Sequence, residues 1–335
     1  MKVGINGVGR IGRTIIRQMF TSPSDQIEIT AINNPGDPKT YTHLLKYDSV
    51  HGAFPGTIQL ADQMLYINEQ PIHFFSEKDP SVIPWDKAGV EIVIDATGKF
   101  KSKEDLSKHI RESVKKVILC APGASDIDKT IVVGINHQDY DASAHDVVSN
   151  ASCTTNCLAP AVKVINDSFG VENGFMTTVH SYTSDQRLLD HSHSDLRRAR
   201  SAAMSMVPTT TGAAKAIGLV IPELKGKLDG YAVRVPTPNV SLVDLTVNLK
   251  HDTTAEEVNQ KLKDAAVGEL QGILSVSTED LVSIDYNGST FSSIVDSSLT
   301  NMISPKCLKL VIWYDNEAGF SNRVINLTEL ISKEL

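Results

Sequence analysis

The first half of the chain alternates short apolar runs with amphipathic stretches. Continuous apolar runs separated by helices are typical of parallel strands buried on both faces of a sheet. We predict strands at Lys2–Asn6, Ile27–Ile32, Val90–Asp95, Lys116–Cys120 and Thr130–Gly134, a helix at Arg10–Phe20, and hairpins around Thr57–Phe75. This half is therefore predicted to be an α/β domain with a parallel sheet.

The pattern changes after Cys153, where a helix is predicted over 153–169. Ser181–Met206 lacks periodicity and is rich in Ser, Asp, His and Arg; a loop of that length is usually functional or disordered. Asn239–Leu249 alternates apolar and polar residues, which predicts an antiparallel sheet with one covered face. Thr254–Ala266 reads as an amphipathic helix, and Asn316–Leu335 as a final helix that is expected to return to the first domain.

Length and charge narrow the class of protein. A chain of 335 residues is long enough for two domains. Its net charge of −8, from 32 Lys plus Arg against 40 Asp plus Glu, argues against nucleic acid or an anionic membrane as the main partner. Basic residues interrupt the first apolar run, which is unlike a signal peptide, and no run reaches the roughly 18 apolar residues of a membrane span. Four cysteines are too few for a disulfide framework, so we expect a cytoplasmic protein.

The run G-V-G-R-I-G, from Gly7 to Gly12, follows a predicted strand and opens a predicted helix. Such glycines permit a tight turn and let a pyrophosphate approach the helix N-terminus, although a plain strand–turn–helix packing role remains the alternative. Asn34 lies 22 residues after Gly12, where an acidic residue usually holds the ribose 2′-hydroxyl. This neutral residue is compatible either with an ordinary NAD site or with one that tolerates a 2′-phosphate.

The run S-N-A-S-C-T-T-N-C places Cys153 and Cys157 one helical turn apart. A metal site needs two further ligands, and the H-x-H pair of His191 and His193 in a polar loop is poor support, so no metal is predicted. At the helix start, the dipole and free N–H groups favour a thiolate at Cys153. Cys157 is expected to be more buried and less reactive. A nucleophilic thiol needs a base, and His180 at a strand end is the candidate.

Three segments contain groups that bind anions well. They are the arginines of L-R-R-A-R (Arg197, Arg198 and Arg200), T-T-T-G (Thr209–Gly212) and R-V-P-T-P-N (Arg234–Asn239). Arginine forms bidentate charge-assisted bonds to phosphate, and T-T-T-G before a helix offers hydroxyl and N–H donors. Each segment also has a simpler interpretation as an ion-paired arginine or a helix cap.

Together these motifs closely resemble the phosphorylating glyceraldehyde-3-phosphate dehydrogenase family over essentially the whole chain. The resemblance rests on N-G-V-G-R-I-G, L-L-K-Y-D-S-V-H-G, A-T-G-K-F, S-N-A-S-C-T-T-N-C-L-A-P, H-S-Y-T-S-D-Q-R, D-L-R-R-A-R, T-T-T-G-A-A-K-A, R-V-P-T-P-N-V-S and W-Y-D-N-E. It implies an α/β N-terminal Rossmann domain at 1–152, joined by the C-terminal helix 316–335, and an α+β catalytic domain with an antiparallel sheet at 153–315. It also implies a homotetramer with the 181–206 loop near a subunit interface and a neighbouring cofactor.

The resemblance further implies roles for single residues. Cys153 is the nucleophile and His180 its base. The inorganic-phosphate site comprises Ser152, Thr154, Arg198, Thr211 and Gly212, and the site for the substrate's own phosphate comprises Thr183 and Arg234. The cofactor contacts comprise Gly7, Gly9, Arg10, Ile11, Gly12, Asn34, Lys78, Thr97, Cys120, Ser192 and Asn316, the last facing the nicotinamide amide.

The implied reaction is the reversible oxidation of glyceraldehyde 3-phosphate, with inorganic phosphate, through a cysteine thioester and hydride transfer to NAD(P). Erythrose-4-phosphate dehydrogenase is the enzymatic alternative, but its relatives usually lose the T-T-T-G-A-A-K pattern present at 209–215. The second alternative is a non-catalytic role in redox sensing or binding. Ala318 and Phe320 depart from the Trp and Tyr that are usual in the family. Asn34, Ser192 and Lys78 resemble the corresponding residues of NADP-accepting members, so we expect NADP to be accepted as well as NAD.

Overall fold

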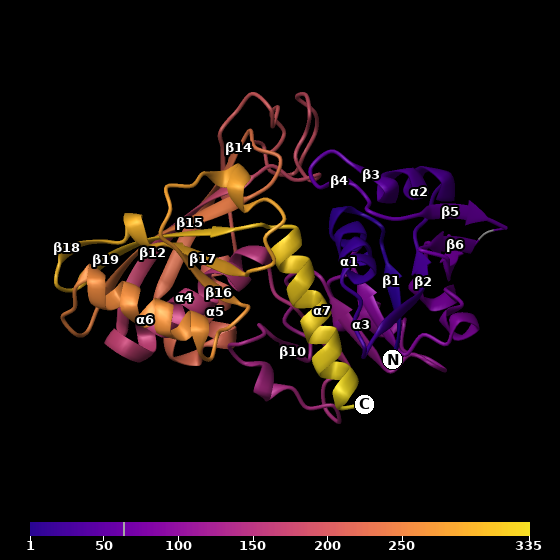
Figure 1. Cartoon of the computed structure of the whole chain (residues 1–335), viewed down its shortest axis with the longest axis horizontal. Helices are drawn as coiled ribbons and strands as arrows, with labels where there is room; N and C mark the ends of the chain where they lie inside the picture. The colour runs from indigo at the N-terminus through magenta and orange to yellow at the C-terminus, as the bar shows by residue number, and fades with distance from the viewer. Residues whose placement is uncertain (63) are drawn as a thin grey trace. The chain divides into compact units, whose positions relative to one another are not determined.

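The computed structural model describes residues 1–62 and 64–335. The chain divides into two compact units, the first made of Met1–Ser152 with Ser321–Leu335 and the second of Cys153–Phe320 (Figure 1). The second unit therefore ends five residues later than the predicted boundary at 315. The final helix, α7 (Ala318–Lys333), starts in the second unit and continues into the first.

The first unit is built on a nine-stranded sheet in the order β10-β11-β9-β8-β1-β2-β7-β6-β5. Its strands are β1 (Lys2–Asn6), β2 (Glu28–Asn33), β5 (Ile58–Ala61), β6 (Met64–Ile67), β7 (Gln70–Phe75), β8 (Ile92–Asp95), β9 (Lys116–Leu119), β10 (Lys129–Thr130) and β11 (Val147–Ser149). Every pairing from β10 to β7 is parallel, whereas β5, β6 and β7 pair antiparallel as the predicted hairpins. The other elements are α1 (Arg10–Thr21), α2 (Pro38–Lys46), α3 (Lys103–Ser107) and the small pair β3 (Tyr47–Asp48) and β4 (Gly52–Ala53).

The strand predicted at Thr130–Gly134 is wrong beyond its first residue. Ile131 and Val132 are fully buried, as the apolar run suggested, but they do not lie in a strand. The side chain of Asn136 accepts from the Val132 N–H at 2.9 Å and donates to the Thr130 carbonyl at 2.9 Å. An amide side chain thus satisfies backbone groups that a neighbouring strand would otherwise bind.

The carboxyl ends of three neighbouring parallel strands carry polar side chains. Asn6 ends β1, Asn33 ends β2 and Asp95 ends β8, and the three strands are adjacent in the sheet. Ligands of open parallel sheets bind outside the carboxyl ends of the strands. This edge of the first unit is consequently where a ligand site is expected.

The second unit contains a sheet in the order β13-β14-β12-β15-β19-β17-β16, with β18 paired to β19. The strands are β12 (Val171–Ser181), β13 (Val207–Thr210), β14 (Leu228–Val235), β15 (Ser241–Leu249), β16 (Leu274–Ser277), β17 (Ser293–Asp296), β18 (Asn301–Ser304) and β19 (Cys307–Tyr314). Most pairings are antiparallel; β12–β14 and β16–β17 are parallel. The helices are α4 (Cys153–Phe169), α5 (Ala213–Val220) and α6 (Ala255–Val267).

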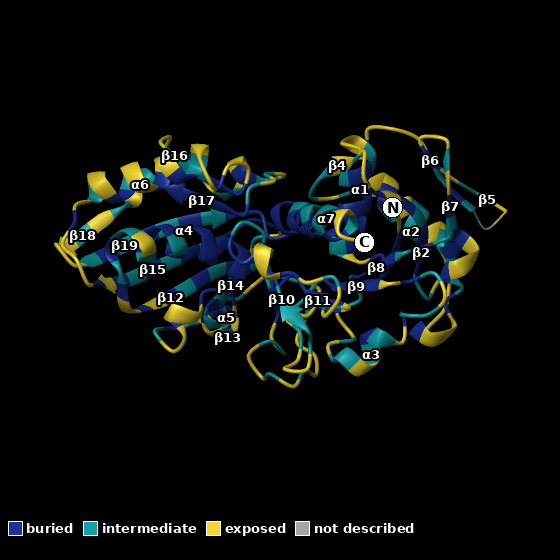
Figure 2. Cartoon of the chain, turned by 90° about the horizontal axis from the view of Figure 1, so that it is seen from below, coloured by how far each residue is buried: buried dark blue, intermediate teal, exposed yellow. Residues whose placement is uncertain are grey.

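Burial alternates along the strands of this second sheet. In β19, every second residue is buried, and β15 follows the same period (Figure 2). Helix α4 packs against β12, β15, β17 and β19, and so covers one face. The predicted architecture, a Rossmann-type α/β domain plus an α+β domain with an antiparallel-rich sheet, is confirmed.

The segment between β12 and β13 forms no helix or strand among the residues that the structure describes, apart from one isolated pairing of Arg187 with Ser201. Across 1–62 and 64–335, no helix has both the length and the apolar character required to cross a lipid bilayer.

Candidate active site and cofactor pocket

Cys153 and His180 lie side by side in the second unit. Cys153 is the first residue of α4, and His180 is the last but one of β12. The Cys153 Sγ is 3.6 Å from the His180 Nε2, within reach of proton transfer. The two residues are 27 positions apart in the sequence, which does not show whether they are close in space. They come together because α4 packs on the sheet that contains β12.

The hydrogen bonds of His180 determine its tautomer. Its Nδ1 lies 2.7 Å from the Ser181 carbonyl oxygen. A carbonyl can only accept, so Nδ1 carries the hydrogen and the Nε2 lone pair faces the Cys153 sulfur. This is the tautomer that a general base requires.

Burial and charge set the resting protonation of the pair. Burial, followed by the nearby Arg234 guanidinium, lowers the pKa of His180 to about 3. Burial raises the pKa of the Cys153 thiol, while Arg234 and the donors of Thr154 oppose part of that rise. The helix-start donors therefore act in the predicted direction, but burial outweighs them. The resting pair is a neutral thiol beside a neutral imidazole.

Cys157 lies one turn further along α4 and is fully buried. Its Sγ donates to the Ile312 carbonyl, at 3.8 Å, and burial raises its thiol pKa well above the ordinary value. The two thiols thus differ in their surroundings as the sequence predicted.

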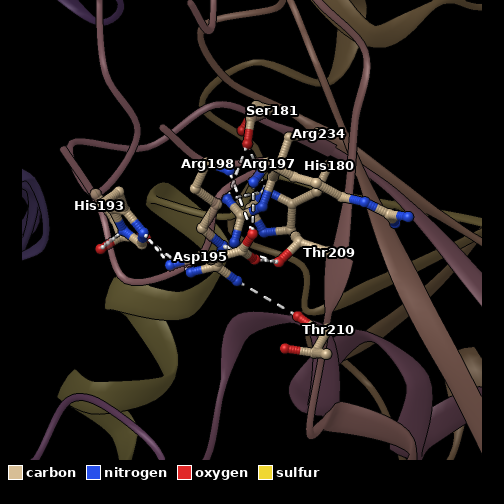
Figure 3. Close-up of polar contacts among 10 residues, drawn as sticks. His180, Ser181, His193, Asp195, Arg197, Arg198, Thr209, Thr210 and Arg234 are labelled. Carbon is tan, nitrogen blue, oxygen red and sulfur yellow. Dashed lines mark hydrogen bonds and ion pairs between the residues drawn. The ribbon is translucent and has the colours of Figure 1, made fainter. Parts of the chain in front are cut away.

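Arg198 lies in a polar cluster at the end of β13 (Figure 3). Its guanidinium donates to Thr209 Oγ1 at 2.9 Å, to Asp185 at 2.7 Å and to the Thr210 carbonyl at 3.4 Å. The adjoining Thr211 and Gly212 lead into α5, with Gly212 at the helix cap. Arg198 also contributes to the lowered pKa of His180, so its charge acts on the Cys153–His180 pair.

Arg234 lies next to His180 on the neighbouring strand. The two residues are paired in the register of β12 and β14. Arg234 Nη1 is 3.1 Å from both the Ser181 carbonyl oxygen and the His180 Nδ1. Because Nδ1 carries a hydrogen, the carbonyl is the acceptor of the Arg234 N–H, and the guanidinium acts on the imidazole through its charge.

Two hydroxyls orient Asn316 in the second unit. Ser181 Oγ and Ser241 Oγ each donate to Asn316 Oδ1, both at 2.9 Å. Two donors identify that atom as the carbonyl oxygen of the amide. The Asn316 NH₂ is thereby presented on the opposite side of the amide.

A cavity of about 270 Å³ lies within the first unit, at the carboxyl ends of β1, β2 and β8. Its lining residues are Asn6, Gly7, Gly9, Asn34, Pro35, Tyr41, Glu77, Lys78, Ala96, Thr97, Lys99 and Phe100. Five of these were predicted as cofactor contacts: Gly7, Gly9, Asn34, Lys78 and Thr97.

The glycines of this pocket fit a dinucleotide. A Cβ on Gly9 would meet nothing within 4 Å, so the cap of α1 is open to a ligand. A Cβ on Gly12 would lie 2.0 Å from the Gly7 carbonyl oxygen, and Gly7 itself has a φ of +96°. The tight turn and the exposed helix N-terminus are the two features that a pyrophosphate site needs.

Comparison with known proteins agrees with this geometry. Residues 1–103 match the model of the glyceraldehyde 3-phosphate dehydrogenase NAD binding domain, and residues 152–316 match that of the C-terminal domain. The chain is 55% identical to "Glyceraldehyde-3-phosphate dehydrogenase 1" of Bacillus cereus over 99% of both chains. It is 54% identical to the enzyme of that name from Geobacillus stearothermophilus, over 100% of this chain and 99% of the relative. It is 52% identical to "Glyceraldehyde-3-phosphate dehydrogenase 2" of a Nostoc species, over the same shares.

The chain belongs to the glyceraldehyde-3-phosphate dehydrogenase family. The family resemblance predicted from the motifs is confirmed, and so is an N-terminal domain of the NAD-binding type. The individual site residues remain predictions, and the structure shows where each of them lies.

Some predicted cofactor contacts do not line the pocket of this family member. Arg10 forms a salt bridge with Asp48. Burial raises the pKa of Asp48, but the hydrogen bond from Arg10 and other donors outweigh burial and lower that pKa to about 2. Ile11 and Gly12 lie in the first turn of α1, and Cys120 follows β9. Ser192 is exposed in the second unit, with its hydroxyl 3.2 Å from His191 Nδ1.

The remaining residues predicted to bind phosphate lie close to Cys153 or His180 in the sequence. Thr154 follows Cys153, and its hydroxyl lies 2.8 Å from the Tyr314 hydroxyl. Thr183 follows β12 and is partly exposed, and Ser152 ends the N-terminal segment of the first unit, directly before Cys153. Among residues 1–62 and 64–335, no three His, Cys, Asp or Glu side chains converge as metal ligands.

Sequence reasoning missed seven residues of the pocket. They are Asn6, Pro35, Tyr41, Glu77, Ala96, Lys99 and Phe100. Asn6 and Ala96 could have been found, because Asn6 ends one predicted strand and Ala96 directly follows another. Glu77 could not, because its place follows from the pairing of β7 with β2, which the sequence pattern does not specify.

Proposed function

We propose that this chain catalyses the reversible oxidation of D-glyceraldehyde 3-phosphate to 1,3-bisphosphoglycerate, using inorganic phosphate and NAD(P). The observation that carries the proposal is the 3.6 Å approach of the Cys153 Sγ to the His180 Nε2, with Arg198 and Arg234 acting on the same imidazole. The test is formation of reduced coenzyme from the aldehyde, coenzyme and inorganic phosphate together, with no formation when the aldehyde is withheld.

In this mechanism the Cys153 sulfur adds to the aldehyde carbon, and His180 Nε2 transfers the thiol proton to the carbonyl oxygen, giving a thiohemiacetal. N–H groups at the start of α4 stabilise the developing oxyanion. His180 next accepts the hydroxyl proton as the carbon is oxidised to a thioester; NAD(P) supplies the hydride acceptor. Phosphate then attacks the thioester, forms the acyl phosphate and releases the Cys153 thiolate, which regains the proton.

Two arginine side chains are proposed to bind the two phosphate groups of the reaction, one arginine for each. Arg198, with Thr211 and the N-terminus of α5, is proposed to hold inorganic phosphate, together with Ser152 and Thr154. Arg234 with Thr183 is proposed to hold the phosphate of the substrate. In the structure both guanidiniums are partly engaged by the chain, Arg198 by Asp185 and Arg234 by the Ser181 carbonyl. A phosphate dianion offers a stronger acceptor than a carbonyl, so it can take over part of these bonds.

Replacing His180 by Asn is expected to slow the alkylation of Cys153 by iodoacetamide at neutral pH by roughly tenfold or more, since base catalysis is typically worth about 10²–10⁴. The imidazole is the base that the structure places against the sulfur, with Nε2 at 3.6 Å. The measurement is the alkylation rate, followed by mass spectrometry of the peptide with Cys153. Alkylation at the parent rate would show that His180 is not the base.

Erythrose 4-phosphate is the rival substrate. The intact Thr209–Lys215 segment and the engagement of Arg198 with Thr209 favour the glyceraldehyde substrate, because they keep the inorganic-phosphate site. Relative catalytic efficiencies with the two aldehydes separate the alternatives, and a preference for the four-carbon aldehyde would reverse the assignment.

We further infer that NADP is accepted beside NAD. Asn34 Oδ1 accepts from the Val8 N–H at 2.8 Å, which leaves the NH₂ as the group that Asn34 can offer to a ribose substituent; it now donates to the Pro35 carbonyl at 3.1 Å. Lys78 is exposed in the same pocket and adds a positive charge. Glu77 lines the pocket too and acts in the other direction. Exposed Ser192 is proposed to reach the adenosine ribose in a neighbouring subunit.

The change Asn34→Asp is expected to shift the coenzyme preference towards NAD. A unit charge 4 Å from a 2′-phosphate costs roughly 4 kcal/mol at an effective dielectric of about 20, and solvent reduces this. The measurement is kcat/KM with each coenzyme in parent and variant. An unchanged ratio would show that Asn34 does not discriminate. NADP efficiency in the parent below about a hundredth of that with NAD, a gap of about 2.7 kcal/mol, would contradict NADP acceptance.

The chain is also proposed to form a homotetramer in the cytoplasm. Five large apolar side chains of the 181–206 segment are 72–82% exposed in the single chain: Leu188, Leu189, Leu196, Met204 and Met206. Large apolar residues that gather in one segment suit a subunit interface. The four cysteines are free thiols, which suits a reducing compartment. Light scattering of the purified protein tests the assembly, and a monomeric mass would contradict it.

A further inference from the structure

A chain of buried polar side chains lies beneath the cofactor pocket of the first unit. It consists of Trp85, His109, Asp95, Asn6 and Asn33, and is referred to as the His109 chain. Each member is at most 3% exposed. Buried polar groups are costly unless they are hydrogen-bonded, so such a chain indicates a defined arrangement.

Hydrogen bonds fix the tautomer of His109. The indole Nε1 of Trp85 lies 3.1 Å from His109 Nδ1. Indole can only donate, so Nδ1 is an acceptor and the ring hydrogen is on Nε2. That nitrogen lies 3.4 Å from both Asp95 Oδ2 and Asn6 Nδ2; because it carries the hydrogen, the carboxylate is the acceptor of the two. Trp85 thus orients the His109 ring, and His109 directs its N–H to the carboxylate.

Asp95 connects His109 to the wall of the pocket. Its Oδ1 accepts from the Thr97 N–H at 3.1 Å and from the Thr97 hydroxyl at 2.7 Å, while Oδ2 accepts from Asn6 Nδ2 at 2.8 Å. Thr97 and Asn6 both line the pocket. The position of this one carboxylate therefore determines two lining residues.

The other end of the His109 chain holds the opposite wall. Asn6 Oδ1 accepts from Asn33 Nδ2 at 2.8 Å. Asn33 also brackets the backbone of Glu77, donating to its carbonyl at 2.9 Å and accepting from its N–H at 2.8 Å. Glu77 and the adjoining Lys78 line the pocket. Side-chain bonds thus join the ends of β1, β2 and β8 to the turn that carries Lys78.

We propose that His109 is a positioning residue for the nucleotide, acting through Asp95 on Thr97 and Asn6, and through Asn33 on the turn at Glu77. This inference rests on the proposed function, since it takes the pocket to be the coenzyme site. His109 itself does not touch the ligand. It holds the carboxylate that sets the shape of the pocket before the coenzyme arrives, which lowers the cost of ordering the pocket on binding.

The test compares two replacements of His109 in the full chain. His109→Gln keeps an acceptor for Trp85 and a donor for Asp95, whereas His109→Leu keeps neither. Isothermal titration calorimetry measures the Kd for NAD and for NADP. We expect His109→Leu to raise the Kd for both by about 5–100-fold, as expected when buried partners lose their hydrogen bonds, and His109→Gln to stay within about threefold of the parent.

The matched control is His137→Leu, in the same unit but outside the pocket. His137 accepts from the Gly134 N–H at 3.1 Å, so this change removes one local hydrogen bond. It is expected to lower the free energy of unfolding without changing either Kd. Equal changes in Kd for His109→Leu and His137→Leu, or loss of stability in His109→Leu with unchanged Kd, would reduce His109 to a structural role.

If His109→Leu does not fold, Trp85→Phe provides the second variant, because it removes the donor that orients the ring, together with part of the buried indole, and leaves His109 in place. We expect it to raise the Kd for NAD about 2–10-fold, within the range for one hydrogen bond. An unchanged Kd would overturn the inference while leaving the proposed function intact. A parent chain that binds neither coenzyme would overturn the proposed function and this inference with it.

Discussion

Cys153→Ser is expected to abolish phosphorylating oxidation while coenzyme binding persists. Serine stays protonated near neutral pH and is a far weaker nucleophile than cysteine. The structure adds that His180 Nε2, the base beside the sulfur, belongs to a neutral imidazole, so a serine hydroxyl in place of the thiol stays protonated at rest. We expect turnover to fall by several decades, as with other lost nucleophiles.

The measurement is steady-state formation of reduced coenzyme, with coenzyme affinity determined by calorimetry in the same preparation. Cys157→Ser is the matched control, since it makes the same atomic change one turn along α4. It should keep substantial activity, because the buried Cys157 thiol donates its hydrogen bond to the Ile312 carbonyl and not to His180. Turnover above about 1% in Cys153→Ser, against the decades expected for a nucleophile, would show that the nucleophile is misassigned. So would an equally complete loss in Cys157→Ser.

The fold was predictable where local pattern and tertiary structure agree. The apolar run Lys2–Asn6 is β1 without change, and α4 begins and ends at the predicted residues Cys153 and Phe169. Thr130–Gly134 shows the limit of periodicity, because the side chain of Asn136 takes the hydrogen bonds that a strand would have formed. An apolar run thus predicts burial more reliably than it predicts strand pairing.

The candidate site was predictable as a set of residues but not as an electrostatic environment. The helix start correctly indicated donors around Cys153, but the degree of burial that raises its pKa depends on residues distant in the chain. Glu77 lines the cofactor pocket for a similar reason, since the Asn34 N–H donates to the Phe75 carbonyl at 3.0 Å and brings the turn after β7 beside β2. Contacts of this kind depend on strand order, which a single sequence leaves open.

Arg234→Ala is expected to raise the KM for glyceraldehyde 3-phosphate by about 10–150-fold and to change that for unphosphorylated glyceraldehyde little. A charge-assisted hydrogen bond to phosphate contributes roughly 1.5–3 kcal/mol, and that contribution exists only for the phosphorylated substrate. Arg234 also faces His180, and its charge is the second cause of the lowered imidazole pKa. Any effect through His180 is shared by both substrates and cancels in their ratio.

The two controls separate charge from geometry. Arg234→Lys keeps the positive charge but not the bidentate fork, so its ratio of KM values should lie between those of the parent and Arg234→Ala. Arg200→Ala removes an exposed arginine paired with Asp190 and should leave both KM values unchanged. If Arg234→Ala impairs both aldehydes equally, the guanidinium does not bind the substrate phosphate. Its contacts with Ser181 and His180 would then mean that Arg234 serves only to position His180 and to lower its pKa.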